Sequence, residues 1–338
     1  MRRLVLSAAF ILVAGVSHAQ SPKEIIANVV TDHALSGFDT LATQSAKFAQ
    51  TAQSDCDPVS EALRSSYAEA FDAWLAVSHL RFGPTEVGDR AFALAFWPDS
   101  RGATPRALAS LISEQDPVAK NPDTYAQVSI AARGFYAMEF LLFDETVFSG
   151  ADPEYLCTLV QTVAADIAKN SAAIAQDWRS DYAAVLLDPT AQGPYRTDEE
   201  VLQELFKALT TGLQFTSETR LGRPLGTYDR PRPTRAEAWR AGRSARNAAL
   251  SLDALRDLAR HLSAHDADLS ARIDDRFEKA LMQLDDLDDP VFAGVAEPQT
   301  RLKIEVVQQS VDAIRAVVTE ELGPTLGVAA GFNSLDGD

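Results

Sequence analysis

A largely apolar segment between residues 133 and 143 carries three residues that could do chemistry, Gly134, Tyr136 and Glu139. Tyr136 and Glu139 are three residues apart, so they share one face of a helix. A carboxylate among apolar side chains is costly unless it is paired, hydrogen-bonded or bound to a cation. A glycine inside a helix costs about 1 kcal/mol, which is tolerated where another group must approach closely. This segment is therefore the best candidate for a functional site. A packed helix whose Glu139 pairs with an arginine of a neighbouring bundle is the alternative.

The signatures of well-known catalytic sites are absent from the sequence. It contains no HExxH zinc helix, no GxSxG nucleophile elbow, no phosphate-binding glycine loop and no CxxC redox pair. His261 and His265 are four residues apart and share a helix face, but no third ligand accompanies them. We therefore expect exposed helix residues there rather than a metal site.

Charge and cysteine content restrict the function further. The formal net charge is −17, and a field of that sign repels nucleic acids, so we expect no nucleic-acid partner. The two cysteines are Cys56 and Cys157. In an exported protein such a pair is more often a disulfide than a metal site. Two separate buried thiols are the alternative.

The N-terminus predicts export. Two arginines precede an apolar run from Leu4 to Val16, and small residues precede a cleavage point near Ala19. This pattern is typical of a secretory signal peptide over residues 1–19. The run is too short for a membrane span of about 20 residues, and charged residues interrupt every later apolar stretch. We expect a periplasmic protein that does not span the membrane.

The elements that hold the candidate residues are expected to be helices. Apolar residues recur at steps of three and four, while no stretch keeps the alternation of period two that marks a strand. The sequence therefore predicts an all-α fold. Its long helices are expected at residues 22–53, 58–82, 124–148, 153–185, 198–219, 235–264, 266–285 and 298–322.

Several of these helices begin with a recognisable cap. A hydroxyl three residues before a glutamate predicts a capping box in three places. These are Ser21 with Glu24, Thr197 with Glu200, and Thr234 with Glu237. Asp57 and Asp152 each precede a proline, which is typical of a capping aspartate followed by proline at the first helical position.

Eight long helices predict two helical-bundle domains of about four helices each. Residues 188–194 contain two prolines and a glycine, which no helix crosses. We place one bundle at residues 20–187 and the other at residues 195–338. In an up-and-down bundle the second and fourth helices run parallel, which brings Cys56 and Cys157 to the same end.

The string Gly134-Phe135-Tyr136-Ala137-Met138-Glu139 resembles the Gly-x-His-x-x-Glu helix of the imelysin family. Other strings resemble family blocks in the family's order, over nearly the whole chain. They are Arg81-Phe82-Gly83-Pro84, Phe96-Trp97-Pro98-Asp99, residues 220–226, Gly242-Arg243-Ser244 and residues 331–338. The resemblance implies a periplasmic or envelope protein linked to iron uptake or iron regulation, with two helical bundles and a site near their junction. Its partners would be iron-uptake proteins of the cell envelope.

The chain departs from the family pattern where Tyr136 stands in place of histidine. Some family members are described as peptidases, but a neutral imidazole is a good zinc ligand and a protonated phenol is not. Zinc and zinc-dependent proteolysis are therefore disfavoured. As a phenolate, Tyr136 would form with Glu139 an oxygen-rich metal site that suits ferric iron better than zinc.

Three functions compete on this evidence. The first is a non-catalytic envelope protein that binds iron, an iron carrier or a partner protein. The second is a metallopeptidase, which would need a histidine such as His79 to replace the missing ligand. The third is a structural or interaction module that has lost metal binding, with Tyr136 and Glu139 merely hydrogen-bonded.

Residues of the family-like blocks also predict what meets at the junction. The ligand-binding or interface candidates are Gly134, Tyr136, Glu139, Trp97, Asp99, Glu218, Arg220, Arg243 and Ser244. We expect an arginine, Arg220 or Arg243, to reach across toward Glu139 or Asp99, because a partly buried carboxylate recruits the forked donors of arginine. The alternative is that Arg220 caps the end of its own helix.

Overall fold

The computed structural model describes residues 20–328. In this range the chain forms helices, turns and loops and no strand, which confirms the all-α prediction. None of the described helices is long and apolar enough to cross a membrane. The predicted signal peptide (residues 1–19) and the last family-like block (residues 331–338) lie outside the described residues.

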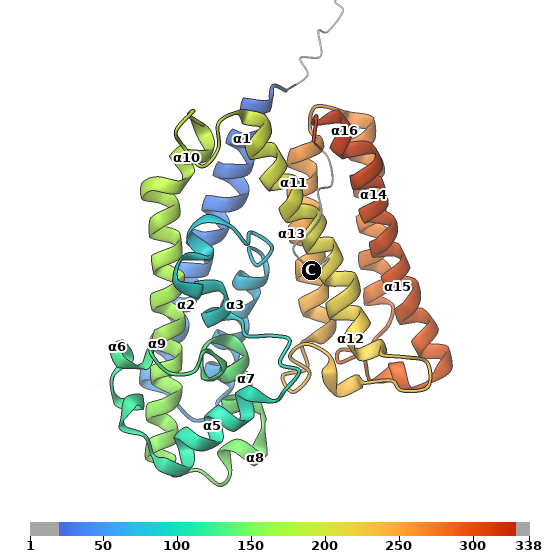
Figure 1. Cartoon of the computed structure of the whole chain (residues 1–338). Helices are drawn as coiled ribbons and strands as arrows, with labels where there is room; N and C mark the ends of the chain where they lie inside the picture. The colour runs from blue at the N-terminus through green and yellow to red at the C-terminus, as the bar shows by residue number, and fades with distance from the viewer. Residues whose placement is uncertain (1–19, 329–338) are drawn as a thin grey trace, which may run out of the picture.

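The N-terminal half of the chain forms one group of helices, coloured blue to green in Figure 1. Its long members are α2 (Ser36–Ser54), α3 (Glu61–Leu75) and α9 (Pro153–Asp177), and α1 (Pro22–Asn28) leads into α2 through a π-helical turn. Helix α2 packs on both α3 and α9. The shorter helices are α4 (Arg90–Leu94), α5 (Ala103–Glu114), α6 (Pro122–Tyr125), α7 (Gly134–Phe143), α8 (Glu145–Phe148) and α10 (Ala183–Leu187).

The C-terminal half forms a second group, coloured yellow to red in Figure 1. Its helices are α11 (Asp198–Gln214), α12 (Gly222–Leu225), α13 (Ser244–Ser263), α14 (Ala267–Asp285), α15 (Pro298–Val317) and α16 (Gly323–Thr325). Helix α14 packs on α13 and α15, and α11 packs on the same two helices. Long helices of both groups are continued by π-helical turns, at Val29–Leu35, Trp178–Tyr182, Phe215–Leu221 and Val318–Leu322.

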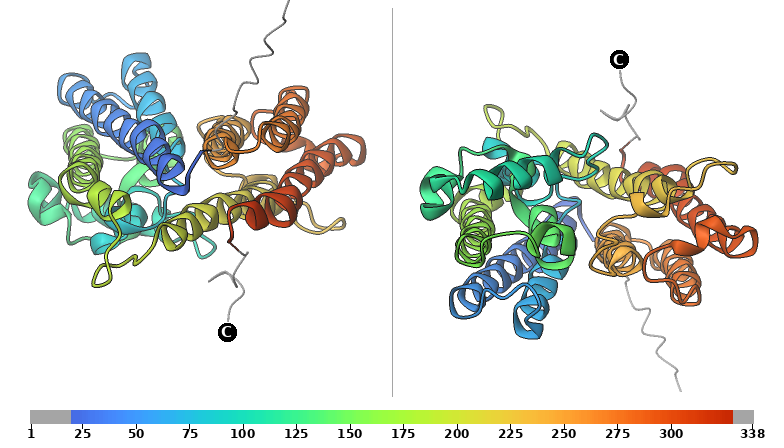
Figure 2. Two further views of the ribbon diagram at one scale, coloured as in Figure 1. Left: turned by 90° about the horizontal axis from the view of Figure 1, so that it is seen from above. Right: turned by 90° about the horizontal axis from the view of Figure 1, so that it is seen from below.

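The two groups lie side by side, as the end-on views of Figure 2 show. Helix α1 packs against α11, and α3 packs against α13. A chain of polar contacts accompanies them: His33 Nδ1 lies 2.7 Å from Oδ2 of the half-exposed Asp257, and His33 Nε2 lies 2.9 Å from the buried His79 Nε2. The division into domains near residues 187–195 stays a prediction.

Most predicted helices are present, but the single helix predicted over residues 124–148 is wrong. That region contains α6, a short 3-10 turn, α7 and α8. The chain breaks before α7 because Arg133 is extended and Gly134 has a φ of +75°. The helix predicted over residues 235–264 begins only at Ser244, and α5 lies where the sequence predicts no helix.

The predicted helix caps form only where the chain that follows them is helical. Ser21 and Glu24 form the predicted capping box, Thr197 accepts the Glu200 N–H at the start of α11, and Asp152 caps α9. Helix α3 is capped by Ser60 instead of Asp57. The box predicted at Thr234 is wrong, because residues 233–235 form a 3-10 turn that continues into irregular chain.

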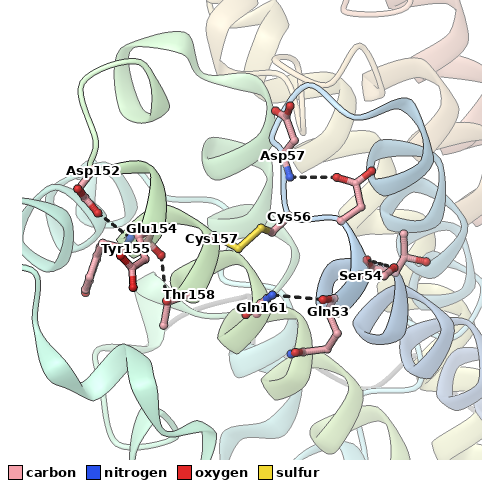
Figure 3. Close-up of a disulfide and its surroundings, with 12 residues drawn as sticks. Gln53, Ser54, Cys56, Asp57, Asp152, Glu154, Tyr155, Cys157, Thr158 and Gln161 are labelled. Carbon is pink, nitrogen blue, oxygen red and sulfur yellow. Dashed lines mark hydrogen bonds between the residues drawn. A yellow bond between two sulfur atoms is a disulfide. The ribbon is translucent and has the colours of Figure 1, made fainter.

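The predicted disulfide between Cys56 and Cys157 is confirmed. Figure 3 shows it joining the connection between α2 and α3 to the first turns of α9. The Cα atoms lie 5.1 Å apart. Beside it, the Gln161 side chain donates to the backbone carbonyl of Gln53. The covalent bond therefore ties the end of α2 to the start of α9, its principal packing partner.

Candidate functional site

Helix α7 places Tyr136 and Glu139 in the interior, where their exposed fractions are 5% and 3%. Gly134 opens this helix against the main chain of the first group. A Cβ atom at this position would lie 2.2 Å from the carbonyl oxygen of Leu94, and the φ of +75° is unfavourable for other residues. The close approach that the glycine permits is therefore to the backbone and not to a ligand.

Tyr136 donates a hydrogen bond from its hydroxyl to Oε1 of Glu237, which comes from the second half of the chain. Arg220 Nε donates to the other oxygen of Glu237 at 2.8 Å. All three residues are buried. Burial, followed by the charge of Glu237, raises the pKa of Tyr136 well above its ordinary value, while Arg220 acts in the opposite direction. The phenol therefore keeps its proton and completes a buried ion pair.

Glu139 is held by the main chain across the junction. Its Oε1 accepts the N–H groups of Arg240 at 2.9 Å and of Ala241 at 3.3 Å. Burial raises the pKa of Glu139 from its ordinary 4.5 to about 7, against the opposing effects of the Arg240 charge and the two N–H groups. This carboxyl group therefore titrates near neutral pH.

Arg240 anchors the irregular segment of residues 236–243 on the end of α7. Its Nε donates to Asp144 Oδ2 at 2.8 Å. Its guanidinium lies 3.8 Å from the ring centre of Phe140 and 4.6 Å from that of Trp239. Because the guanidinium is both ion-paired and stacked, it fixes the N–H groups that hold Glu139.

Arg220 is presented to the junction by the π-helical turn that follows α11. Such turns occur frequently at functional sites. The Arg220 guanidinium lies 4.8 Å from the ring centre of Phe215. Phe215 meets Trp97 edge to face, and Trp97 stacks on Tyr136 with ring centres 6.1 Å apart. Trp97 therefore lies where the two halves of the chain meet.

A pocket of about 180 Å³ opens beside this network. Its wall includes Trp97, Asp99, Tyr136, Glu139, Phe140, Arg223, Arg235, Trp239 and Arg240. Since one water occupies about 30 Å³ of liquid volume, the pocket has room for several waters or a small organic molecule. The wall combines aromatic rings with two carboxyl groups and three arginines, a mixture suited to a small polar ligand.

Asp99 lines the pocket but serves the backbone of the turn before α5. Its carboxylate accepts the N–H groups of Ala103 at 2.9 Å, Thr104 at 2.8 Å and Arg101 at 3.2 Å. Burial alone would raise the pKa of Asp99, but these hydrogen bonds outweigh burial and lower it. Asp99 is therefore an ionised, satisfied carboxylate in the pocket wall.

Arg220 does not form the predicted pair with Glu139 or Asp99. Its partner is Glu237, and among residues 20–328 no described hydrogen bond joins its guanidinium to a carbonyl of its own helix. The physical reason is that backbone N–H groups already satisfy Glu139 and Asp99, whereas Glu237 has no backbone donor of this kind among the hydrogen bonds described.

Arg243 reaches across the junction, but it forms an ion pair with Asp72 on α3 and not with Glu139 or Asp99, the partners that the sequence predicted. Arg246 binds the same aspartate. Ser244 is buried at the start of α13, and its hydroxyl has no hydrogen-bond partner within residues 20–328. Glu218 lies elsewhere, paired with Arg315 at 3.1 Å on the surface of the second group.

Glu237, Arg240 and Asp72 belong to the junction although the sequence did not indicate them. The spacing from Thr234 predicted a capping box for Glu237, so the sequence did not indicate that this carboxylate is buried. Prolines at 231 and 233 and a glycine at 242 enclose the segment. This punctuation is the signal that could have excluded a helix start there.

The residues around Tyr136 do not fit a metal ion as they are arranged. Its hydroxyl donates a hydrogen bond to Glu237. The positively charged guanidinium of Arg220 forms an ion pair with the same carboxylate. His79, the histidine considered as a replacement ligand, contacts His33 instead. Residues 20–328 contain no group of three or more histidine, cysteine, aspartate or glutamate side chains arranged to hold a metal.

Comparison with known proteins shows the family of this chain. Residues 34–318 match the sequence profile described as imelysin. The chain belongs to the imelysin family. A search of curated proteins finds no match.

Solved structures share the imelysin-like fold. An imelysin-like protein from Psychrobacter arcticum 273-4 is 20% identical, with a TM-score of 0.79, and the match covers 92% of this chain and 97% of that one. A candidate iron-regulated protein A precursor from Parabacteroides distasonis is 11% identical, with a TM-score of 0.74, covering 89% and 96%. At these identities the likeness establishes the fold alone.

The raised pKa of Glu139 predicts a pH-dependent stability in this imelysin-family chain. Between pH 4.5 and 7 the native state binds more protons than the unfolded state, so its stability falls as the pH rises. A shift of this size corresponds to about 3 kcal/mol. Glu139→Gln keeps an acceptor for both N–H groups but does not ionise. We expect its stability relative to the wild type to rise by about 2 to 3 kcal/mol between pH 5 and pH 8.

Urea denaturation of both proteins at several pH values measures this difference. His79 titrates in both proteins, so its opposite contribution, which is lost as the pH falls, cancels in the comparison; burial and His33 lower its pKa. Parallel pH profiles for the two proteins would contradict the prediction.

Proposed function

We propose that this chain is an exported, non-catalytic protein of the bacterial cell envelope that is associated with iron uptake or iron regulation. It binds an iron carrier or a partner protein through the pocket beside Tyr136 and Glu139. The observation that carries the proposal is the network of Tyr136, Glu237 and Arg220, which uses the metal-motif position as a hydrogen-bond donor. The family membership supports the association with iron, as does the name of the Parabacteroides distasonis protein.

The competing metallopeptidase function receives little support from the same residues. A catalytic zinc site needs three protein ligands and an open position for water. Tyr136 is protonated and bound to Glu237, and Glu139 accepts two backbone N–H groups. A zinc ion would have to displace a phenolic proton in the neighbourhood of the Arg220 charge, which opposes a cation.

Export is supported by the disulfide and by the signal-peptide pattern together. Disulfides persist in oxidising compartments such as the periplasm, and Cys56 and Cys157 are joined. Residues 1–19 carry the pattern of a cleaved leader. We therefore propose the periplasm as the location of the mature protein.

The amount of this protein in envelope fractions is expected to rise when iron is withdrawn from the cells that produce it, because uptake proteins are needed when iron is scarce. Quantitative mass spectrometry of fractions from chelator-treated and iron-replete cells measures the change. Adding back iron should reverse it, whereas adding back zinc should not.

An amount that is the same with and without iron would contradict the association with iron. Stoichiometric, tight zinc binding by metal-free protein, with peptide hydrolysis that disappears in Glu139→Ala, would contradict the non-catalytic assignment and favour the metallopeptidase.

A further inference from the structure

An unusually basic segment lies beside the pocket of this acidic protein. Residues 223–235 contain four arginines, at 223, 230, 232 and 235, and a single acid, Asp229. The whole chain has a net charge of −17, so this segment reverses the sign of the local charge. Among residues 20–328, none of the four guanidinium groups has a carboxylate partner within ion-pair distance.

Two of these arginines, Arg223 and Arg235, line the pocket itself. Arg223 lies over the face of Trp97, with 5.8 Å between its guanidinium carbon and the ring centre. Its Nε atom is buried and has no hydrogen-bond partner within the described residues. Burial and the nearby charge of Arg235 lower the pKa of Arg223. A desolvated donor beside a second positive charge is unfavourable unless an anion joins them.

The other arginines of the junction show how unusual this arrangement is. Arg220, Arg240 and Arg243 are each paired with a carboxylate, respectively Glu237, Asp144 and Asp72. The fold therefore neutralises the arginines that hold the two halves together and leaves Arg223 and Arg235 without a carboxylate partner.

We propose that Arg223 and Arg235 bind the oxyanion group, carboxylate or phosphate, of a small organic ligand that enters the pocket. The forked donors of arginine match both kinds of oxyanion in a bidentate geometry. Carboxylates are also hard oxygen ligands for iron. A polycarboxylate iron chelate could therefore hold iron with some carboxylates and contact the two arginines with another. This choice of an iron chelate as the class of ligand rests on the proposed function.

The remaining wall of the pocket orients such a ligand. Asp99 and Arg240 are engaged by their own partners, the N–H groups before α5 and Asp144. Trp97, Trp239 and Phe140 form apolar surfaces in the same wall. The anionic end of the ligand therefore faces Arg223 and Arg235, and its less polar part contacts the aromatic rings.

Calorimetric titration of the full mature protein with citrate, ferric citrate and inorganic phosphate tests the proposal. We expect binding of at least one of these probes, weakened about tenfold to a hundredfold by Arg223→Ala and by Arg235→Ala, since a hydrogen bond to a charged group contributes about 1.5 to 3 kcal/mol. Arg230→Ala removes the same charge from an exposed position outside the pocket wall. This control should retain nearly wild-type affinity, and circular dichroism should show that all three variants are folded.

Failure of all three probes to bind, or equal weakening by Arg230→Ala, would overturn the oxyanion site. Arg223→Lys keeps the positive charge but removes the forked donors of the guanidinium. Full affinity in this variant would overturn the bidentate geometry. Citrate binding that depends on Arg223, in a protein whose amount does not respond to iron, would support the oxyanion site and contradict the association with iron. Conversely, an iron response in a protein that binds none of the probes would support the association with iron and contradict the oxyanion site.

Discussion

Replacing Glu237 with alanine is expected to lower the free energy of unfolding by about 3 to 5 kcal/mol. The substitution leaves the Arg220 guanidinium buried without its carboxylate and the Tyr136 hydroxyl without an acceptor. An uncompensated buried charge is much more costly than the loss of an exposed pair. Urea denaturation followed by circular dichroism measures the effect.

A matched control removes a carboxylate from an exposed ion pair. Glu69 pairs with Lys47, and about half of each side chain is exposed, so Glu69→Ala should cost less than about 1 kcal/mol. Replacing both partners, as in Arg220→Met with Glu237→Leu, should cost less than Glu237→Ala alone, because no charge is left unpaired. A loss below 1 kcal/mol in Glu237→Ala would show that the network does not stabilise the junction.

Removal of the disulfide by the double substitution of Cys56 and Cys157 with serine should lower the free energy of unfolding by about 4 to 5 kcal/mol. The two cysteines are 101 residues apart, and closing a loop of about 100 residues restricts the unfolded chain by this amount in the chain-entropy model. Denaturant unfolding of the oxidised wild type and of the double variant measures the difference.

A reducing agent supplies the control for this experiment. It should bring the wild type close to the stability of the double variant and leave the variant unchanged. Equal stability of the oxidised and reduced wild type would contradict the prediction. Mass spectrometry without reduction verifies that the two thiols are joined in the starting protein, with a loss of two hydrogens.

Local patterns in the sequence predicted much of the fold. Apolar steps of three and four residues predicted the helices that became α3, α9 and α15, because each of these helices buries one continuous face. The disulfide was predicted from an even number of cysteines in an exported chain and from their place near the starts of two parallel helices. These features depend on neighbours in the chain and on helix geometry, which a sequence displays directly.

The predicted helix over residues 124–148 failed for a reason that is not local. This region is rich in apolar residues, and α7 alone is buried on nearly every side. A segment buried all round has no polar face to mark its boundaries. The contact of Gly134 with the backbone of Ala93 and Leu94, which requires the break before α7, comes from a distant part of the chain.

The candidate site likewise contains residues that the sequence indicated and partners that only the structure revealed. Tyr136 and Glu139 could be recognised from the sequence because polar side chains in an apolar helix require an explanation. Their partners could not be recognised, since Glu237 lies 101 residues from Tyr136 and is at the correct spacing from Thr234 for an ordinary cap. Whether a carboxylate caps a helix or enters the interior depends on which chain packs beside it.

The sequence by itself determined the helical class, the paired cysteines, the family and the segment that carries the candidate site. Only the tertiary structure decided that backbone N–H groups satisfy Glu139, that Arg220 pairs with Glu237, and that Arg223 and Arg235 line a pocket without a carboxylate partner of their own. Helix periodicity is encoded over a few neighbouring residues. The choice of partner for a buried charge is made by competition among all the donors that the fold brings within reach, and that competition has no local signature.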